Sequence, residues 1–316
     1  MSEELLKSFI LNRASEEAFS RCRILSPLPQ VPRNSHCDEA YPDSARSALL
    51  VFLPYDRSEG EGIIAPFARS NYYKEAVSRL KKLSTALRAK TKASKGDLRI
   101  FCNSRFPEKE MAWHCGLGNI GKNSLLLTPE YGSLGIIAGM FLPFDLPGDS
   151  PLEKEYYRGC GSCSLCRDAC LAGAVKEEGS INKSLCFQHL STERQVLSPE
   201  VTARWNILYG CQICQDVCPQ NRKIIPGPAL ERGFLGARPD LRFILTCSDT
   251  ELKEYRKGTV LGQAWIDSVA LRRNALICLW REGSEEERQE LVEAYRNSPE
   301  EILAGTAQIL ERVIPI

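Results

Sequence analysis

The chain has 316 residues, of which 43% are hydrophobic and 26% are charged, so it is long enough for two or three hydrophobic cores. Its 41 lysines and arginines balance 40 aspartates and glutamates, which excludes a global field that attracts nucleic acid or a membrane surface. The N-terminal residues carry acids among apolar ones, unlike a signal peptide, and no stretch approaches 18 apolar residues. We therefore expect a cytoplasmic protein without a membrane span.

Short apolar runs predict four buried strands in the first part of the chain, at residues 47–54, 98–102, 124–127 and 134–142. Apolar residues at helical spacing predict a helix over 71–90, between the first two strands. Pro107 suits the first turn of a second helix that ends near Gly116. This pattern of strands and helices indicates an α/β domain over residues 1–145.

Turn residues at 144–151 indicate a linker, and a cysteine-rich part follows it to about residue 228. From there helical spacing prevails, as in VALRRNALICLW from Val269. No internal repeat is apparent. The predicted fold class is therefore α+β, with three domains at residues 1–145, 151–228 and 229–316.

Four cysteines of the middle part have the spacing C-x2-C-x2-C-x3-C, which is typical of bacterial ferredoxins. They are Cys160, Cys163, Cys166 and Cys170. Two residues between thiolates let a tight loop wrap one 4Fe-4S cubane, whereas the fourth cysteine of such a run reaches a different cluster. The run therefore implies a second cluster.

A second group, Cys211, Cys214 and Cys218-Pro219, is one cysteine short of a full run, and Cys186 makes up the number. Exchange of the fourth ligands gives two sets of four thiolates. Cluster 1 is predicted to use Cys160, Cys163, Cys166 and Cys218, and cluster 2 to use Cys170, Cys186, Cys211 and Cys214. Structural zinc is the alternative, since it also takes cysteines from C-x2-C pairs. Leu171 replaces the proline that usually follows the first run.

Six of the fourteen cysteines remain outside these sets, namely Cys22, Cys37, Cys102, Cys115, Cys247 and Cys278. Disulfides are not expected, because the chain is large and crowds its thiols into one region. Cys278 falls in an apolar helical stretch and is expected in the core.

The segment Gly116-x-Gly118-x-x-Gly121-Lys122 satisfies a dinucleotide-binding pattern and nearly satisfies a phosphate loop. Its context argues against both functions. The glycines follow a helix-like segment, and Asn123 stands where a phosphate loop needs Ser or Thr. A glycine turn before the strand at 124–127 is the structural interpretation.

Four stretches, in order along the chain, resemble segments of one known family. They are AWHCGLGNIGKNSLLL from Ala112, CGSCSLCRDACLAGA from Cys160, CFQHLSTE from Cys186 and YGCQICQDVCPQNR from Tyr209. Weaker matches, SARSALLVFLPY and RRNALICLW, lie on either side. The chain resembles the epoxyqueuosine reductases, cobalamin-dependent iron-sulfur oxidoreductases that complete queuosine in tRNA.

This resemblance implies a cobalamin-binding domain over 1–145, similar to that of reductive dehalogenases, a ferredoxin-like domain over 151–228, and a short HEAT-like helical domain over 229–316. It implies that two 4Fe-4S clusters pass single electrons to cobalamin from a flavodoxin or ferredoxin system, with tRNA as a candidate partner. A cobalamin site is then predicted in the glycine segment. Its residues are Gly116, Gly118, Gly121, Lys122 and Ser124.

The segment FCNSRFPEKEMA from Phe101 departs from the family, which has an aspartate here that donates a proton to the substrate. The aspartate's position falls on Cys102, or on Asn103 after one shift. These two are the candidate catalytic residues, although Cys102 also suits the end of a buried strand. Because the aspartate is absent, the substrate stays open between epoxyqueuosine and another compound.

Several alternatives remain open. Basic pairs at 222–223 and 272–273 suit phosphate contacts or a solvated surface. The histidines His36, His114 and His189 are expected to have no metal-ligand partner four residues on. His114 and His189 suit a cobalt-facing position or an ordinary polar contact. A non-catalytic, ferredoxin-like electron carrier is the alternative function. No oligomeric state is predicted.

Overall fold

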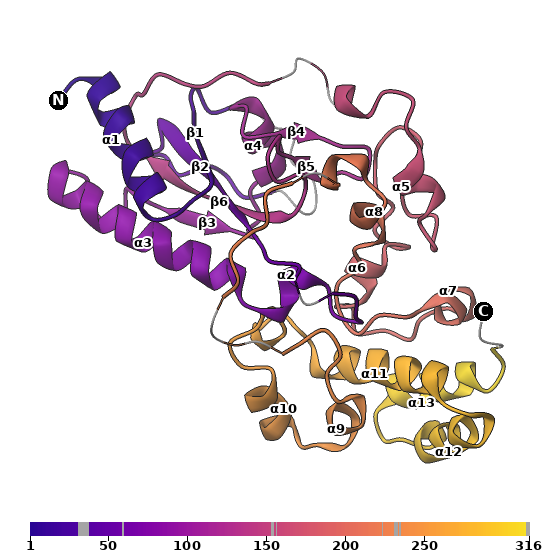
Figure 1. Cartoon of the computed structure of the whole chain (residues 1–316). Helices are drawn as coiled ribbons and strands as arrows, with labels where there is room; N and C mark the ends of the chain where they lie inside the picture. Colours follow the sequence, from indigo (N-terminus) through magenta and orange to yellow (C-terminus); the bar gives the residue numbers. More distant parts are fainter. Residues whose placement is uncertain are drawn as a thin grey trace. The chain divides into compact units, whose positions relative to one another are not determined.

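The computed structural model describes residues 1–30, 38–58, 60–152, 155, 157–222, 224–230, 233 and 235–313 (Figure 1). The chain divides into two compact units, each built from segments far apart in sequence. The first unit contains Met1–Asp56, Tyr72–Cys163 and Pro219–Ala229, and the second contains Arg57–Asn71, Ser164–Cys218 and Leu230–Ile316. The three consecutive domains expected from the sequence stay a prediction.

A four-stranded antiparallel sheet in the order β1-β2-β6-β3 forms the centre of the first unit. Its strands are β1 (Arg21–Leu25), β2 (Ser47–Pro54), β6 (Gly135–Leu142) and β3 (Ile100–Cys102). In the register, Ser47 of β2 lies opposite Leu142 of β6, and Ile100 of β3 lies opposite Met140. Every residue of β2 is buried, as its unbroken apolar run predicts for a strand that is covered on both faces.

Helices pack on this sheet. Ala48, Leu50 and Phe52 share one hydrophobic cluster with Met111 and Ala112 of α4 (Glu108–His114). The alternate residues of β2 point to the opposite face. There α1 (Glu3–Glu16) and α3 (Tyr72–Lys90) run side by side (Figure 1). A hairpin of β4 (Asn119–Ile120) and β5 (Leu126–Leu127) completes the described strands of this unit.

The structure confirms the α+β fold class and the main predicted elements, at 47–54, 71–90 and 134–142. The strand expected at 98–102 begins at Ile100, and the one expected at 124–127 shrinks to Leu126–Leu127 because residues 121–125 form a turn. Pro107 is the N-cap of α4 and not part of its first turn. Helix α1 was not expected, since its apolar residues form no single stripe: Leu5 is exposed while Leu6 and Ile10 are buried.

The second unit is helical. Its short helices are α2 (Pro66–Arg69), α5 (Leu165–Asp168), α6 (Phe187–Leu190), α7 (Pro199–Arg204) and α8 (Ile213–Asp216). A C-terminal group contains α9 (Leu241–Thr246), α10 (Asp249–Tyr255), α11 (Ser268–Glu282), α12 (Glu285–Arg296) and α13 (Glu301–Leu310).

Single 3-10 turns occur in both units. They are η1 (Arg158–Cys160) and η2 (Pro219–Asn221) in the first unit and η3 (Val260–Gly262) in the second.

Helix α11 is the core of the C-terminal group. It packs against α9, α12 and α13, and its residues from Ala270 to Cys278 are buried except for Arg272. Cys278 lies in this core, as expected. Within the described ranges, no helix has the length and apolar character needed to cross a bilayer.

Candidate iron-sulfur site

The two cysteine runs fold into the same local structure. Helices α5 and α8 have four residues each and carry Cys166 and Cys214 at their second positions. Their N-cap residues, Ser164 and Gln212, have φ, ψ angles of −123°, 2° and −122°, 4°. The two helices also contact each other. The expectation of no internal repeat is therefore wrong at this short scale, and the shared pattern C-x2-C-x-D-x-C was its signal in the sequence.

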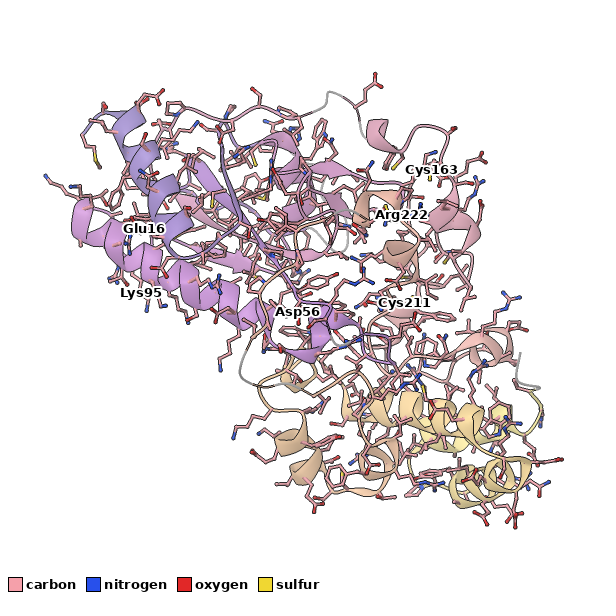
Figure 2. All side chains as sticks on the ribbon, viewed as in Figure 1. Glu16, Asp56, Lys95, Cys163, Cys211 and Arg222 are labelled. Atoms are coloured by element: carbon pink, nitrogen blue, oxygen red, sulfur yellow. The ribbon has the colours of Figure 1, made fainter. Side chains whose placement is uncertain are left out.

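The four thiols predicted for cluster 2 lie near one another in the second unit. Cys211, labelled in Figure 2, lies two residues before α8, and Cys186 is the N-cap of α6. Burial raises the pKa of Cys211 to about 11, and repulsion from Cys186 and Cys170 adds to this rise. Burial raises the pKa of Cys214 as well, with further repulsion from its neighbouring cysteines. Thiols that repel one another when ionised are stabilised once a metal cluster binds their thiolates.

The donor set of cluster 2 fits a cubane. Cys170 Sγ accepts a hydrogen bond from the amide of Ala174 at 3.2 Å, and such amide donors stabilise the charge on a cluster's sulfur ligands. In the described part of the chain, no three His, Cys, Asp or Glu side chains are arranged around one single-ion position. Four cysteine thiolates are the ligand set that a 4Fe-4S cluster takes.

The cysteines predicted for cluster 1 are divided between the units. Cys160 and Cys163 belong to the first unit, where the Cys163 amide donates to the Cys160 carbonyl at 2.9 Å. Cys166 and Cys218 belong to the second unit. Their joint ligation of one cubane stays a prediction from the spacing.

Two buried polar residues of α11 hold the segments on either side of the cluster 2 cysteines. The guanidinium of Arg273 donates to the carbonyls of Leu190, Glu193 and Gln195 at 2.6–2.7 Å, just after Cys186 and α6. The side chain amide of Asn274 donates to the carbonyls of Ser191 and Leu208 at 3.0 and 2.9 Å. Leu208 lies three residues before Cys211, so one turn of α11 fixes both approaches to the cluster.

Arg273 also corrects an expectation. Its side chain is fully buried over the ring of Trp205, and burial lowers its pKa to about 10. Arg272 bonds to Asp249 at 2.6 Å and to the carbonyl of Cys247 at 2.8 Å. The pair at 272–273 is therefore neither a phosphate site nor a solvated surface. Of the pair at 222–223, Arg222 is exposed and Lys223 lies outside the described residues.

The predicted cobalamin residues all lie in or beside the hairpin of β4 and β5. A Cβ at Gly116, whose φ is 71°, would lie 2.2 Å from the Ser150 carbonyl oxygen, and one at Gly118 would lie 2.7 Å from that of Leu127. One at Gly121 would lie 2.8 Å from the Leu127 side chain. These glycines are thus required by close packing within the chain. The segment follows helix α4 and contains β4, so it does not join a strand to a helix as both nucleotide-binding patterns require.

Lys122 and Ser124 are engaged within the chain as well. Lys122 Nζ donates to the carbonyls of Gly161 and Cys163 at 2.7 and 3.1 Å, which ties the hairpin to the first cysteine run. The Ser124 carbonyl accepts a hydrogen bond from Lys109 Nζ at 2.6 Å. These contacts do not test a corrin site, and the cobalamin contacts of the five residues stay a prediction.

The candidate proton donors lie in one bend, which we call the Asn103 loop (residues 102–108). Cys102 Sγ donates to the Ile137 carbonyl at 3.5 Å, and burial together with the charge of Glu108 raises its pKa well above the ordinary value. Cys102 thus matches the end of a buried strand better than it matches an exposed acid. Asn103 is exposed and adopts a left-handed φ of 51°. Glu108, which was not predicted, bonds to this loop.

The remaining predicted residues have ordinary surroundings. His189 Nε2 lies 3.7 Å from a carboxylate oxygen of Glu193, which is an ordinary polar contact. The ring of His114 packs edge-on against Trp113. Burial raises the pKa of Cys22 and of Cys115 to about 12. His36 and Cys37 lie outside the described residues.

Known proteins agree with this geometry. A family model described as a 4Fe-4S double cluster binding domain matches residues 159–221. The epoxyqueuosine reductase of Bacillus subtilis is 30% identical over 279 residues, which are 83% of this chain and 70% of that protein. Its solved structure, with the catalytic aspartate loop swung out of the active site, has a TM-score of 0.81 at 24% identity and covers 97% of this chain and 89% of its own.

A further structure is of an epoxyqueuosine reductase with an epoxyqueuosine-modified stem loop of tyrosine tRNA. It has a TM-score of 0.79 at 23% identity, over 97% of this chain and 89% of its own. These structures show that the chain shares their fold, and the 30% identity with the Bacillus subtilis sequence shows the family relationship. The chain therefore belongs to the epoxyqueuosine reductase family, a family of oxidoreductases.

Proposed function

We propose that this protein is an iron-sulfur reductase of queuosine synthesis that uses cobalamin to remove the epoxide oxygen of epoxyqueuosine in tRNA. The double-cluster segment carries this proposal, because two cubanes serve to deliver electrons one at a time. The family relationship supports the choice of reaction. A structure of a relative with a modified tRNA stem loop supports the choice of substrate.

We assign the thiolates as the spacing predicts, with Cys160, Cys163, Cys166 and Cys218 on cluster 1 and Cys170, Cys186, Cys211 and Cys214 on cluster 2. The mutual proximity of the cluster 2 thiols supports the second set. The repeated turn at α5 and α8 supports an exchange of fourth ligands, since it puts Cys170 and Cys218 at equivalent places.

The assignment of cobalamin as a cofactor rests on the family relationship alone. When bound, it supplies a strongly reducing metal centre that accepts electrons from the clusters. The chain's own contributions are more local. Lys122 holds the hairpin against the first cysteine run, and the Ala174 amide stabilises charge on Cys170. A flavodoxin or ferredoxin is the proposed electron donor, since each carries one electron at a low potential.

The proposal is tested with protein purified without oxygen and loaded with cobalamin. Incubation with tRNA that carries epoxyqueuosine and a low-potential reductant is expected to yield queuosine, measured by chromatography of the digested nucleosides. A protein that binds cobalamin but leaves the epoxide intact would favour a related reductase with another substrate. A protein that exchanges electrons but retains no cobalamin would favour the electron carrier.

A further inference from the structure

Glu108 is the carboxyl group that shapes the Asn103 loop. Its Oε1 accepts hydrogen bonds from the Ser104 amide at 2.8 Å and the Ser104 hydroxyl at 2.6 Å. Its Oε2 accepts one from the Asn103 amide at 3.2 Å. These bonds hold Asn103 in a left-handed conformation that residues other than glycine rarely adopt. The loop is thus bent so that one serine hydroxyl lies against one carboxyl group.

The surroundings of Glu108 suit a group that exchanges protons at neutral pH. Burial raises the pKa of Glu108 to about 7, although the hydrogen bonds from Ser104 and Asn103 oppose that rise. The titratable group that faces it is the Cys102 thiol, which burial keeps protonated. The nearby cations have other partners, because Arg105 pairs with Asp38 and Lys109 bonds to the Ser124 carbonyl.

Ser104 gives this carboxyl group a route outward. Its side chain is partly exposed, and its neighbours Asn103 and Arg105 are exposed. The amide of Phe106 donates to Ser104 Oγ at 3.2 Å and so fixes the hydroxyl oxygen. A substrate that reaches the open side of the loop therefore meets a hydroxyl backed by a carboxyl group.

We propose that Glu108 and Ser104 together deliver the protons for epoxide reduction. This inference rests on the proposed function. Removal of the oxygen breaks both carbon–oxygen bonds, forms a carbon–carbon double bond and releases water, so it consumes two electrons and two protons. The electrons come from the low-potential donor through the clusters. Ser104 gives the departing oxygen two protons in turn and regains each from Glu108, which is recharged from water.

The test compares variants of the cobalamin-loaded, anaerobic protein on tRNA that carries epoxyqueuosine. Glu108→Gln is expected to lower the turnover rate about a hundredfold or more, the usual loss when a general acid is removed. Glu108→Asp is expected to restore part of the rate. Ser104→Ala is expected to lower the rate while Ser104→Thr retains it. Glu110→Gln, on the same helix, is the matched control and is expected to keep the wild-type rate.

A pH profile separates proton delivery from a structural role. Wild-type turnover is expected to fall as the pH rises through about 7, since the acid form of Glu108 is required, and Glu108→Gln is expected to lose this limb. Iron content and the rate of cluster reduction by dithionite are expected to stay unchanged in both variants. Wild-type rates and profiles in Glu108→Gln and Ser104→Ala would overturn the inference. If the Glu108→Gln variant loses its iron, the turnover rate and pH profile of Ser104→Ala alone test the inference. An inactive wild type would instead overturn the proposed function.

Discussion

Residues differ in how well their role can be predicted from their spacing in the sequence. The two cysteine runs, at 160–170 and 211–218, are recognisable because thiolates around a cubane recur at fixed short intervals. Glu108 is not, because its importance depends on the chain bending back from α4 onto Asn103 and Ser104. Arg273 misled the sequence analysis for the same reason, since a basic pair carries no sign that one member is buried under carbonyl groups.

Loss of Arg273 is expected to be severe. Arg273→Met would leave the carbonyls of Leu190, Glu193 and Gln195 without their buried donor, at a cost of roughly 3–5 kcal/mol in the free energy of unfolding. Urea unfolding followed by circular dichroism measures this loss. Arg238→Met is the control, because its ion pair with Glu282 is exposed and is expected to contribute less than about 1 kcal/mol. Equal effects in the two variants would contradict the role given to Arg273.

Glu108 makes stability depend on pH. Its pKa is near the ordinary 4.5 in the unfolded chain and about 7 in the fold, so the folded state holds the proton longer. Its contribution to stability is full below 4.5 and is lost as the pH rises towards 7. Glu108→Gln is expected to flatten the dependence of the melting temperature on pH between 5 and 7.5. An unchanged slope in the variant would show that the carboxyl ionises without cost in the fold.

At the scale of elements, long and strongly patterned segments were predictable and short ones were not. The run SALLVFLP forms β2 because an eight-residue apolar stretch has few alternatives to a buried strand. SLLL gives only the two residues of β5, because Gly121 and Ser124 close a turn that takes the rest. In the glycine segment the sequence context already argued against a nucleotide loop, whereas the two-residue strands β4 and β5 are too short to be predicted.

The C-terminal helices begin at strong caps, and one of these can be tested. Ser284 and Glu287 form a capping box at the start of α12, so Ser284→Ala is expected to cost about 1 kcal/mol in the free energy of unfolding. Ser78→Ala, on the exposed face of α3, is the control and is expected to be neutral or slightly stabilising. Chemical denaturation distinguishes the two. A neutral Ser284→Ala would mean that neighbouring helices, and not the cap, define this end.

For the whole molecule, the sequence predicted the fold class and the order of its chemistry but not its two discontinuous units. Segments such as Arg57–Asn71 and Pro219–Ala229 join units that lie far from them in the chain. Local patterns contain no information on such exchanges, because the contacts involved connect residues that lie far apart in the chain. One example is Ser133, whose amide donates to the Asn221 side chain at 2.8 Å.

The assignment of ligands predicts the metal content of the whole protein. Two intact cubanes require about eight iron and eight sulfide per chain. Cys186→Ala is expected to reduce both by about half, since it removes one ligand of cluster 2 only. Cys247→Ala is the matched control, because Cys247 lies on the C-terminal helices and its thiol faces the Ile244 carbonyl. Iron analysis and paramagnetic resonance of the reduced protein measure the loss, and full iron in Cys186→Ala would contradict the assignment.

Two neighbouring side chains on α11, those of Arg273 and Asn274, link the C-terminal helices to the cysteine segments. They fasten the polypeptide after Cys186 and before Cys211 from a part of the chain more than sixty residues farther on. Retention of the inorganic cofactor then depends on the tail staying folded. On gradual warming, iron release is expected to follow the melting of these helices, even while the antiparallel sheet survives.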